Sequence, residues 1–461
     1  MPGSPENAEL IALLSEEAVR NSTIPREPYQ TFNVKRGLRN ADSTGVLVGL
    51  TTVGEVHGYI INESEKVAVP GKLFYRGYDI EHLVEGYQKE GRFGFEEVCY
   101  LLLFGSLPTA DRLESFSKLL AATRRLPDNF TEDIILKSPS PSIMNKLARA
   151  VLGAYSYDER PDDIQVSNVV RQSLELIARF PTMVAYGYQA VRRYFHGKSM
   201  FLHYPDAELS TAEAFLQMIR PNASFTRLEA ELLDLCLILH AEHGGGNNSS
   251  FTIHVVTSTD TDTYSAIAAA IGSLKGPKHG GANARVPEMV ADLMRSVSDV
   301  KDDDAVREYL GKLLDGEAFD RTGLIYGMGH PVYTVSDPRA IILRRRAAEL
   351  AKEKGCMDQL AVYESIERLA PEVFRQKKKS EKPLCANVDL YSGFVYSMMD
   401  VPASLFTPLF AVARMPGWCA HRIEEITSGG RVIRPAYKNV VRKSAYVPLN
   451  ERHLARKVDE K

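Results

Sequence analysis

The stretch 226–251, TRLEAELLDLCLILHAEHGGGNNSSF, shows most clearly how this chain folds. Thr226 and Glu229 have the spacing of a capping box, which indicates that a helix begins here. Apolar residues then recur every three or four positions, as they do along the buried side of an α-helix. They are Leu228, Leu232, Leu235, Cys236 and Leu239. The glycines at 244–246 are expected to end this helix, because glycine readily closes a helical segment.

Three further segments carry helix signals of the same kind. Thr109 can cap a segment with apolar residues at 113, 116, 119 and 120, which ends before Pro127. Asp262 or the next residue can start a helix over TYSAIAAAIGSLKG. Asp337 followed by Pro338 combines a cap with proline at the first helical position, and opens PRAIILRRRAAELAKEKG. The chain is therefore expected to be mainly α-helical.

Strand-like sequence is confined to an early region. Four short runs, rich in β-branched and aromatic residues, are separated there by Gly, Pro and Asn-Glu. They are VLVGLTTV (46–53), GYIIN (58–62), KVAV (66–69) and KLFYRG (72–77). Short runs with this punctuation predict a small antiparallel sheet.

Length and composition limit the class of protein. The 461 residues are enough for two or more domains, and 44% of them are hydrophobic. The 56 Lys and Arg nearly balance the 59 Asp and Glu, which argues against the basic surface of a nucleic-acid-binding protein. The start of the chain resembles no targeting signal, and no apolar run approaches the roughly 20 residues of a membrane span. The five cysteines include no CxxC pair, so we expect a cytoplasmic protein without disulfides, membrane contacts or nucleic-acid partners.

Five of the eleven histidines lie between 240 and 330, several of them among glycines. His243 follows Leu239 by four residues, so its place on the predicted buried stripe favours a core histidine at the helix end. His240 and His243 lie three apart and can share a metal ion. However, zinc usually takes three or four protein ligands, and no third ligand lies at a standard spacing. We therefore expect no metal in this protein.

His279 lies in the motif LKGPKHGGAN, just before a helix that is expected to begin near Asn283. The positive end of a helix disfavours protonation of a nearby imidazole. A neutral imidazole can donate a hydrogen bond to the oxygen of a developing enolate. His279 is therefore a candidate for this task, and a loop histidine without a role is the alternative.

Charged residues in later motifs complete a candidate site. His330 follows a Gly-Met-Gly turn, and Arg339 falls in the first turn of a helix, where a cation is unfavourable unless it meets an anion. Asp389 precedes a helix, and its simplest role is that of an N-cap. Arg414 and Arg434 lie between apolar residues, which is costly unless each binds an anion. Together these residues are suited to removing a proton α to a carbonyl, polarising a second carbonyl and holding a dicarboxylate.

Six motifs, in order along the chain, resemble the citrate synthase family. They are GKLFYRGYDIEHLVEG, HAEHGGGNNSSF, LKGPKHGGAN, GMGHPVYTVSDPRA, NVDLYSGFVYSMMDVPASLFTPLFAVARMPGWCAHRIEE and RVIRPAY. The similarity runs from about residue 55 to about residue 437. It implies a citrate-synthase-like, two-domain helical fold with a small N-terminal antiparallel β element, assembled as a homodimer. The implied parts are a helical extension at 1–45, a large domain at 46–280 and 391–461, and a small mobile domain at 281–390.

The resemblance also implies a role for each candidate residue. Asp389 matches the base that takes a methyl proton from acetyl-CoA, and His279 matches the donor to its thioester carbonyl. His330 matches the histidine that polarises the ketone of oxaloacetate. The residues that match the binders of the oxaloacetate carboxylates are His243, Arg339, Arg414 and, from the other subunit, Arg434. The implied activity is that of an acyltransferase of the tricarboxylic acid cycle, which uses CoA only as part of its acyl-CoA substrate.

Two departures from the family pattern leave the acyl-CoA substrate open. Pro331 and Thr334 stand where related sequences often carry basic residues that contact the CoA phosphates, and Gly244 replaces a frequent acidic residue. The candidates for these phosphate contacts are Lys275, Lys278 and Arg344, with its two neighbouring arginines.

Two alternatives to citrate synthesis therefore stay open. Within the family, the alternative is 2-methylcitrate synthesis from propionyl-CoA, because a few pocket residues decide whether one additional methylene is accepted. From a different class, the alternative is a metal-binding or regulatory protein built around the HxxH pair and the lysine run at 377–382.

Overall fold

The computed structural model describes residues 5–40, 42, 44–63 and 65–452. The chain divides into two units, one formed by 1–48 with 434–461 and the other by 49–433. The predicted domain boundaries near 280 and 390 lie inside the second unit. That residues 281–390 move as a domain stays a prediction.

The described part of the unit formed by 1–48 and 434–461 contains helices. They are α1 (Pro5–Ser22), α2 (Glu27–Thr31), η1 (Arg36–Leu38) and η5 (Leu449–Glu451). The large apolar side chains of α1 are exposed within this unit, namely Leu10, Ile11, Leu13, Leu14 and Val19. The predicted N-terminal extension is thus helical, and its apolar side chains find little cover in its own unit.

The unit formed by 49–433 is built from helices and one small sheet, which confirms the predicted fold class. Its α-helices are α3 (Ile80–Lys89), α4 (Phe95–Phe104), α5 (Ala110–Thr123), α6 (Ile143–Ala154), α7 (Val166–His196), α8 (Thr211–Ile219), α9 (Arg227–His240), α10 (Asn248–Thr257), α11 (Thr263–Lys275), α12 (Ala282–Ser296), α13 (Asp303–Asp315), α14 (Pro338–Glu353), α15 (Met357–Lys378), α16 (Val388–Met398) and α17 (Phe406–Thr427). Three short elements are η2 (Thr131–Leu136), η3 (Tyr155–Tyr157) and η4 (Ala403–Leu405). Among the helices described, none is long and apolar enough to cross a membrane.

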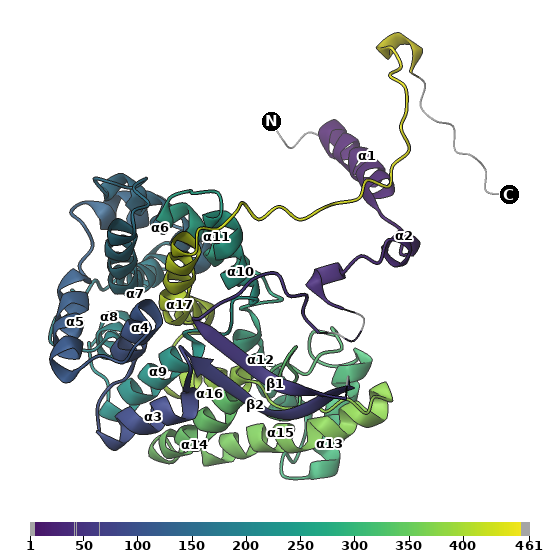
Figure 1. Cartoon of the computed structure of the whole chain (residues 1–461). Coiled ribbons are helices and arrows are strands. Elements are labelled where there is room, and N and C mark those ends of the chain that lie inside the picture. The colour runs from purple at the N-terminus through teal and green to yellow at the C-terminus, as the bar shows by residue number, and fades with distance from the viewer. Residues whose placement is uncertain (1–4, 41, 43, 64, 453–461) are drawn as a thin grey trace. The chain divides into compact units, whose positions relative to one another are not determined.

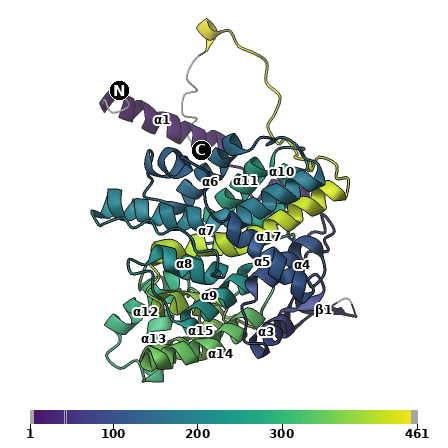
Figure 2. The same cartoon turned by 90° about the vertical axis from the view of Figure 1, so that its left-hand side faces the viewer.

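Helix α17 runs through the middle of this unit (Figures 1 and 2). It contacts α4, α7, α9, α10 and α11, and its residues are buried almost without interruption from 406 to 422. A helix that is covered on every side is usually apolar all round. The buried Arg414, His421 and Arg422 of α17 therefore require polar partners.

The predicted helix starts are confirmed by their caps. Thr226 and Glu229 form both hydrogen bonds of the capping box at α9. The other predicted caps, whose side chains each accept a backbone N–H, are Thr109, Asp262 and Asp337. These short sequence signals are local, so they determine where a helix starts whatever packs against it.

The sheet consists of β1 (Gly54–Asn62), β2 (Glu65–Tyr75) and β3 (Tyr78–Asp79), paired antiparallel in that order. The predicted runs 58–62 and 66–69 lie in β1 and β2, and the run 72–77 begins in β2 and ends in the turn that follows it. The prediction of a strand over 46–53 is wrong. Residues 47–50 are exposed and belong to no strand, since a β-rich run needs a pairing partner to become a strand.

The sheet supports the loop that carries His330. The Gly71 N–H donates to the Ser336 carbonyl at 3.1 Å, and the Tyr333 hydroxyl donates to the Lys72 carbonyl at 3.3 Å. A Cβ atom on Gly71 would lie 2.5 Å from the Tyr333 ring, so only glycine lets the strand approach this closely. The small β element thus positions one side of the candidate site.

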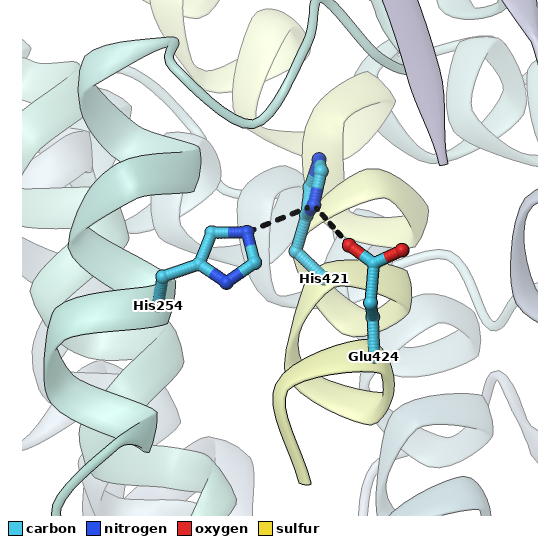
Figure 3. A group of neighbouring side chains, drawn as sticks. All are labelled: His254, His421 and Glu424. Atoms are coloured by element: carbon cyan, nitrogen blue, oxygen red, sulfur yellow. Dashed lines mark hydrogen bonds and ion pairs between the residues drawn. The ribbon is translucent and has the colours of Figure 1, made fainter. Parts of the chain in front are cut away.

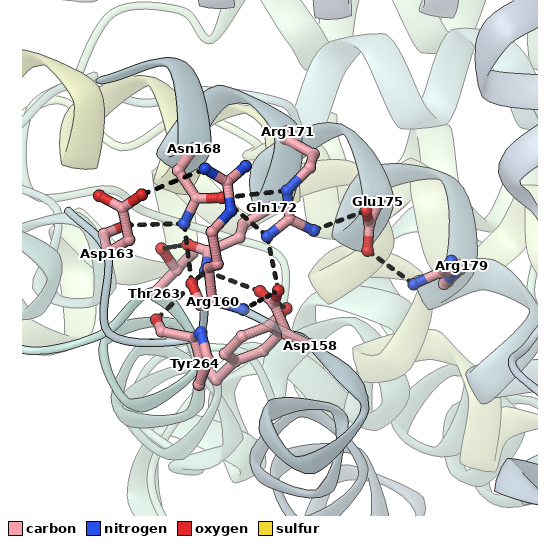
Figure 4. A network of polar contacts seen from close by, with 11 residues as sticks. Asp158, Arg160, Asp163, Asn168, Arg171, Gln172, Glu175, Arg179, Thr263 and Tyr264 are labelled. Atoms are coloured by element: carbon pink, nitrogen blue, oxygen red, sulfur yellow. Dashed lines mark hydrogen bonds and ion pairs between the residues drawn. The ribbon is translucent and has the colours of Figure 1, made fainter. Parts of the chain in front are cut away.

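A network of buried and partly exposed polar groups joins α7 to α11 (Figure 4). Asp158 accepts hydrogen bonds from Arg171 at 2.6 Å, Gln172 at 2.8 Å and Tyr264 at 2.8 Å, and Thr263 donates to the Gln172 side chain. Burial alone would raise the pKa of Asp158, but a backbone N–H and these side-chain donors lower it to about 2. The network is therefore self-contained, with each carboxylate oxygen of Asp158 paired inside the protein.

Candidate active site

His243 lies beside His330 and Tyr333 inside the larger unit. Its ring centroid is 5.0 Å from that of His330 and 5.5 Å from that of Tyr333. Helix α9 ends at His240, so His243 lies three residues beyond the helix, and its predicted place on the helical stripe is wrong. Burial, followed by the charge of Arg339, holds the pKa of His243 well below its usual range. Its buried Nε2 has no hydrogen-bond partner, which a histidine with a purely structural role in the core does not explain.

The proton position of His330 follows from its backbone contacts. The N–H groups of Val332 and Tyr333 donate to His330 Nδ1 at 3.1 and 3.0 Å. Because Nδ1 accepts these bonds, the hydrogen that the ring carries is on Nε2. The ring also stacks on Tyr333 with centroids 4.7 Å apart. The backbone N–H groups and the Tyr333 ring thus fix the orientation of His330.

Arg339 has a protein partner that the sequence analysis did not assign to it. Its Nε and Nη2 donate to the two carboxylate oxygens of Asp337 at 3.0 and 2.8 Å. Both side chains are buried, and Asp337 also caps α14. The expected conflict between Arg339 and the helix dipole is therefore removed by Asp337 itself. Burial lowers the pKa of Arg339, but the adjacent Asp337 more than offsets this, so the pKa lies above its ordinary value.

Arg414 is a buried charged group with unused hydrogen-bond donors. Its side chain is 0% exposed, and Nε donates to the His240 carbonyl at 2.6 Å. The two terminal nitrogens, Nη1 and Nη2, have no hydrogen-bond partner. Burial lowers the pKa of Arg414 to about 10, with Glu242 acting in the opposite sense, so the guanidinium is charged at pH 7. A buried cation with unused donors is costly unless an anion reaches it.

His279 lies in the turn before α12, as predicted. Its Nε2 is 3.1 Å from Ser249 Oγ, and the Trp418 indole N–H donates to the same hydroxyl oxygen at 3.0 Å. Burial, followed by the charge of Arg414, lowers the pKa of His279 to about 4. The ring is therefore neutral at pH 7, and burial is a larger cause than the helix end that the sequence analysis invoked.

Asp389 is not the N-cap of α16. The Asn387 side chain caps this helix by accepting from the Asp389 N–H at 3.0 Å, so the simplest interpretation of Asp389 is wrong. Burial raises the pKa of Asp389 to about 6, and the charge of Arg339 counteracts part of the rise. Asp389 thus combines a half-buried carboxylate with a pKa near neutrality, as a general base requires.

These side chains lie in the part of the chain that a family model covers. The model for citrate synthase, C-terminal domain, matches residues 42–436. A citrate synthase from Haloferax volcanii is 36% identical over 410 residues, which cover 86% of this chain and 98% of that protein. This chain belongs to the citrate synthase family.

Two further relatives have names that differ in the acyl-CoA substrate or come from solved structures. A 2-methylcitrate synthase from Shewanella oneidensis is 34% identical over 379 residues, which cover 80% of this chain and 89% of that protein. A citrate synthase from Thermoplasma acidophilum, whose solved structure is a ternary complex with carboxymethyl coenzyme A and oxaloacetate, has a TM-score of 0.73 at 26% identity. That alignment covers 91% of this chain and 99% of the other. The chain is therefore a condensing enzyme and an acyltransferase of this family.

Arg434 belongs to the other unit, where it is exposed. No hydrogen bond or ion pair joins it to any residue that the structure describes. Of the candidates for CoA contacts, Lys275 and Lys278 are exposed on either side of the turn that leads to His279. Arg344 is paired with Glu367 at 3.0 Å.

The residues that hold the site in place were not predicted from the sequence. Asp337 was recognised only as a cap, and Ser249 and Trp418 were not recognised at all. No spacing rule predicts the contact between Trp418 and Ser249, because the two residues are 169 positions apart. The HxxH pair is not arranged as a metal site: His240 directs Nδ1 at the Cys236 carbonyl, whereas His243 faces His330.

Proposed function

We propose that this protein is a citrate synthase, which condenses acetyl-CoA with oxaloacetate and water to give citrate and CoA. The observation that carries the proposal is the buried Arg414, whose two terminal nitrogens have no partner. A planar guanidinium with two unused donors is suited to a carboxylate. Neutral histidines and a base with a raised pKa lie around it, which is the set of groups that enolisation and aldol addition require.

The first step of the proposed reaction is enolisation of acetyl-CoA. Asp389 takes a proton from the methyl group, and a pKa of about 6 makes it a stronger base than an ordinary carboxylate. The neutral ring of His279 donates a hydrogen bond to the thioester oxygen as charge develops there. Ser249 contacts Nε2 of His279, so we assign this donation to Nδ1.

The second step is attack of the enol carbon on the ketone of oxaloacetate. The Nε2–H of His330 is the donor that polarises this carbonyl. Arg414 and His243 bind the carboxylates with their unpaired nitrogens. Arg339 contributes positive charge while Asp337 holds its orientation. Hydrolysis of the resulting thioester by water then releases CoA and citrate.

The choice of acyl-CoA is the point at which the two candidate activities differ. One methylene changes the activation free energy by about 1–3 kcal/mol, so relatives with either name are compatible with the same site. The test is kcat/KM for CoA release with oxaloacetate and either acetyl-CoA or propionyl-CoA. A preference for acetyl-CoA of tenfold or more supports citrate synthesis. A preference for propionyl-CoA assigns the protein to 2-methylcitrate synthesis, and no CoA release with either rejects both.

We also propose that two subunits of a homodimer share each active site. Arg434 is exposed and has no hydrogen-bond or ion-pair partner among the described residues, and in a twofold dimer it can complete the site of the other subunit. The test is complementation. Arg434→Ala and Asp389→Asn homodimers are expected to be nearly inactive, whereas mixed dimers regain up to one working site. Mixed dimers of verified composition that stay inactive would exclude this arrangement.

Closure of a small domain over the site is the third part of the proposal, because the enol and the thioester intermediate need protection from water. Oxaloacetate should then bind first and tighten the acetyl-CoA site. Equal acetyl-CoA affinity with and without an unreactive dicarboxylate would contradict this coupling. The exposed Lys275 and Lys278 are the candidates for CoA phosphates that this proposal retains.

A further inference from the structure

A group of three potential metal ligands lies between α10 and α17 (Figure 3). His254 comes from α10, and His421 and Glu424 come from α17. His254 Nε2 is 3.1 Å from His421 Nδ1, and His421 Nδ1 is 3.7 Å from Glu424 Oε2. The ligand atoms all lie within 4.8 Å of one another, and no other set of three His, Cys, Asp or Glu is so placed among the residues described.

The outer nitrogen of each imidazole faces a carboxylate. His254 Nδ1 is 2.7 Å from Glu425 Oε2, and His421 Nε2 is 3.0 Å from Glu242 Oε1. In zinc proteins, ligating histidines usually direct their second ring nitrogen at a carboxylate or carbonyl, which orients the ring and raises its basicity. Both histidines thus have the orientation of metal ligands, with their inner nitrogens turned toward one point.

The spacing of the inner atoms fits a tetrahedral ion. With zinc–nitrogen bonds of about 2.0–2.1 Å, two ligand nitrogens lie about 3.3 Å apart, close to the 3.1 Å between the two rings. Glu424 Oε2 is buried and has no hydrogen-bond partner, although Oε1 accepts from the Thr52 N–H. A Cβ atom on Gly245 would come 3.5 Å from His254 Nε2, so the glycine keeps large side chains away from this side of the group.

We propose that His254, His421 and Glu424 form a site for a divalent transition metal such as Zn²⁺, with a water molecule as the fourth ligand. Three glutamates surround two imidazoles there, so a divalent cation compensates negative charge that the rings alone do not balance. Binding replaces the proton between the two rings, and about one proton is released for each metal ion. The ion would join α10 to α17 next to the glycine loop that follows His243.

The experiment uses the full-length protein, stripped of metal with a chelator and titrated with Zn²⁺ alone by calorimetry. One ion per chain is expected, together with a rise in Tm that depends on zinc concentration. His254→Gln should weaken binding at least tenfold and abolish this Tm rise. Glu425→Gln, which removes only an orienting carboxylate, should weaken binding roughly 10–100-fold. The control is His82→Gln, a change of an exposed histidine on α3, which should bind like the parent.

Zinc bound by residues outside the proposed site would give different results. X-ray absorption at the zinc edge should show nitrogen and oxygen neighbours only, whereas sulfur neighbours would assign the ion to cysteines and overturn the proposal. Binding that survives in both His254→Gln and Glu425→Gln, or is lost in His243→Gln instead, would overturn it too. Absence of saturable binding to the parent protein is the simplest refutation. None of these results depends on citrate synthesis, so the proposed reaction is tested separately.

Discussion

The network around Asp158 and the site around Arg414 are both buried and both polar, but their hydrogen bonding differs. In the network, the Asp158 side chain is 2% exposed and both of its oxygens are paired with donors of the same chain. In the candidate active site, the terminal nitrogens of Arg414 and Nε2 of His243 are equally buried and have no partner. The hydrogen bonds of Asp158 are thus completed within the protein, whereas those of Arg414 and His243 are not.

This difference indicates which buried polar groups stabilise the fold and which bind a ligand. An unpaired buried donor costs about 1–3 kcal/mol of folding free energy, and more if it is charged. A protein keeps such groups where a ligand completes their hydrogen bonds. We therefore expect substitutions in the network to lower stability and substitutions in the site to lower activity.

Asp389→Asn should have the largest effect. The amide keeps the shape of the carboxylate but cannot accept the methyl proton, so kcat should fall by roughly 10²–10⁴-fold. Oxaloacetate affinity and Tm should change little, because Asn387 rather than Asp389 caps the helix. Steady-state kinetics and a thermal melt measure both quantities. A large loss of Tm with normal kcat would mean that Asp389 stabilises the fold and is not the catalytic base.

Arg414→Met tests the incomplete region directly. Loss of a charge-assisted pair should raise the Kd for oxaloacetate roughly 10–100-fold, which corresponds to about 1.5–3 kcal/mol. The ligand-free protein should be no less stable than the parent, since a buried unpaired cation is removed. Calorimetric titration and melting of the same samples give both values. A destabilised variant that still binds oxaloacetate tightly would mean that Arg414 stabilises the fold and does not bind the ligand.

Asp158→Asn should produce the opposite result. Removal of the negative charge weakens several hydrogen bonds, so we expect a loss of about 1–3 kcal/mol in the free energy of unfolding with kcat unchanged. The pKa of Asp158 is lowered to about 2 in the folded protein. Its stabilising contribution is therefore present above about pH 4 and is lost as the pH falls toward 2. Denaturant unfolding at several pH values should show a flatter acid dependence in the variant.

The smallest effect is the pH dependence of the rate. Asp389 must be ionised to act as a base, and its pKa is about 6. The value of kcat/KM should therefore rise with pH through about 6 and be roughly tenfold below its plateau at pH 5. An acid limb that lies near pH 4 instead would mean that Asp389 is an ordinary exposed carboxylate or not the base.

Much of this architecture was predictable from the sequence, because the signals are local. Capping residues such as Thr226 and Asp337 act within one helical turn, so the helix starts were predicted correctly. The run 46–53 was misassigned because strand formation depends on a distant partner. His243 was misplaced because the helix ends three residues earlier than the apolar pattern suggests.

The supporting contacts of the site were not predictable in this way. The pairs Trp418–Ser249 and Arg414–His240 join segments more than 160 positions apart, and only the packing of α17 brings them together. The same holds for His254 and His421, whose separation exceeds any metal-ligand spacing that a sequence pattern describes. Asp337 was only partly predictable for a different reason. Its side chain both caps a helix and pairs with Arg339, and the sequence pattern indicates only the cap.

Exchange of the acetyl-CoA methyl protons with deuterated water tests the central claim most directly. An unreactive C4 dicarboxylate fills the oxaloacetate site without offering a ketone, so enolisation is observed apart from condensation. We predict that the parent protein and Asp158→Asn incorporate deuterium at similar rates, and that Asp389→Asn is slower by at least 10²-fold. Exchange at the parent rate in Asp389→Asn, measured by mass spectrometry, would contradict the proposed role of this carboxylate.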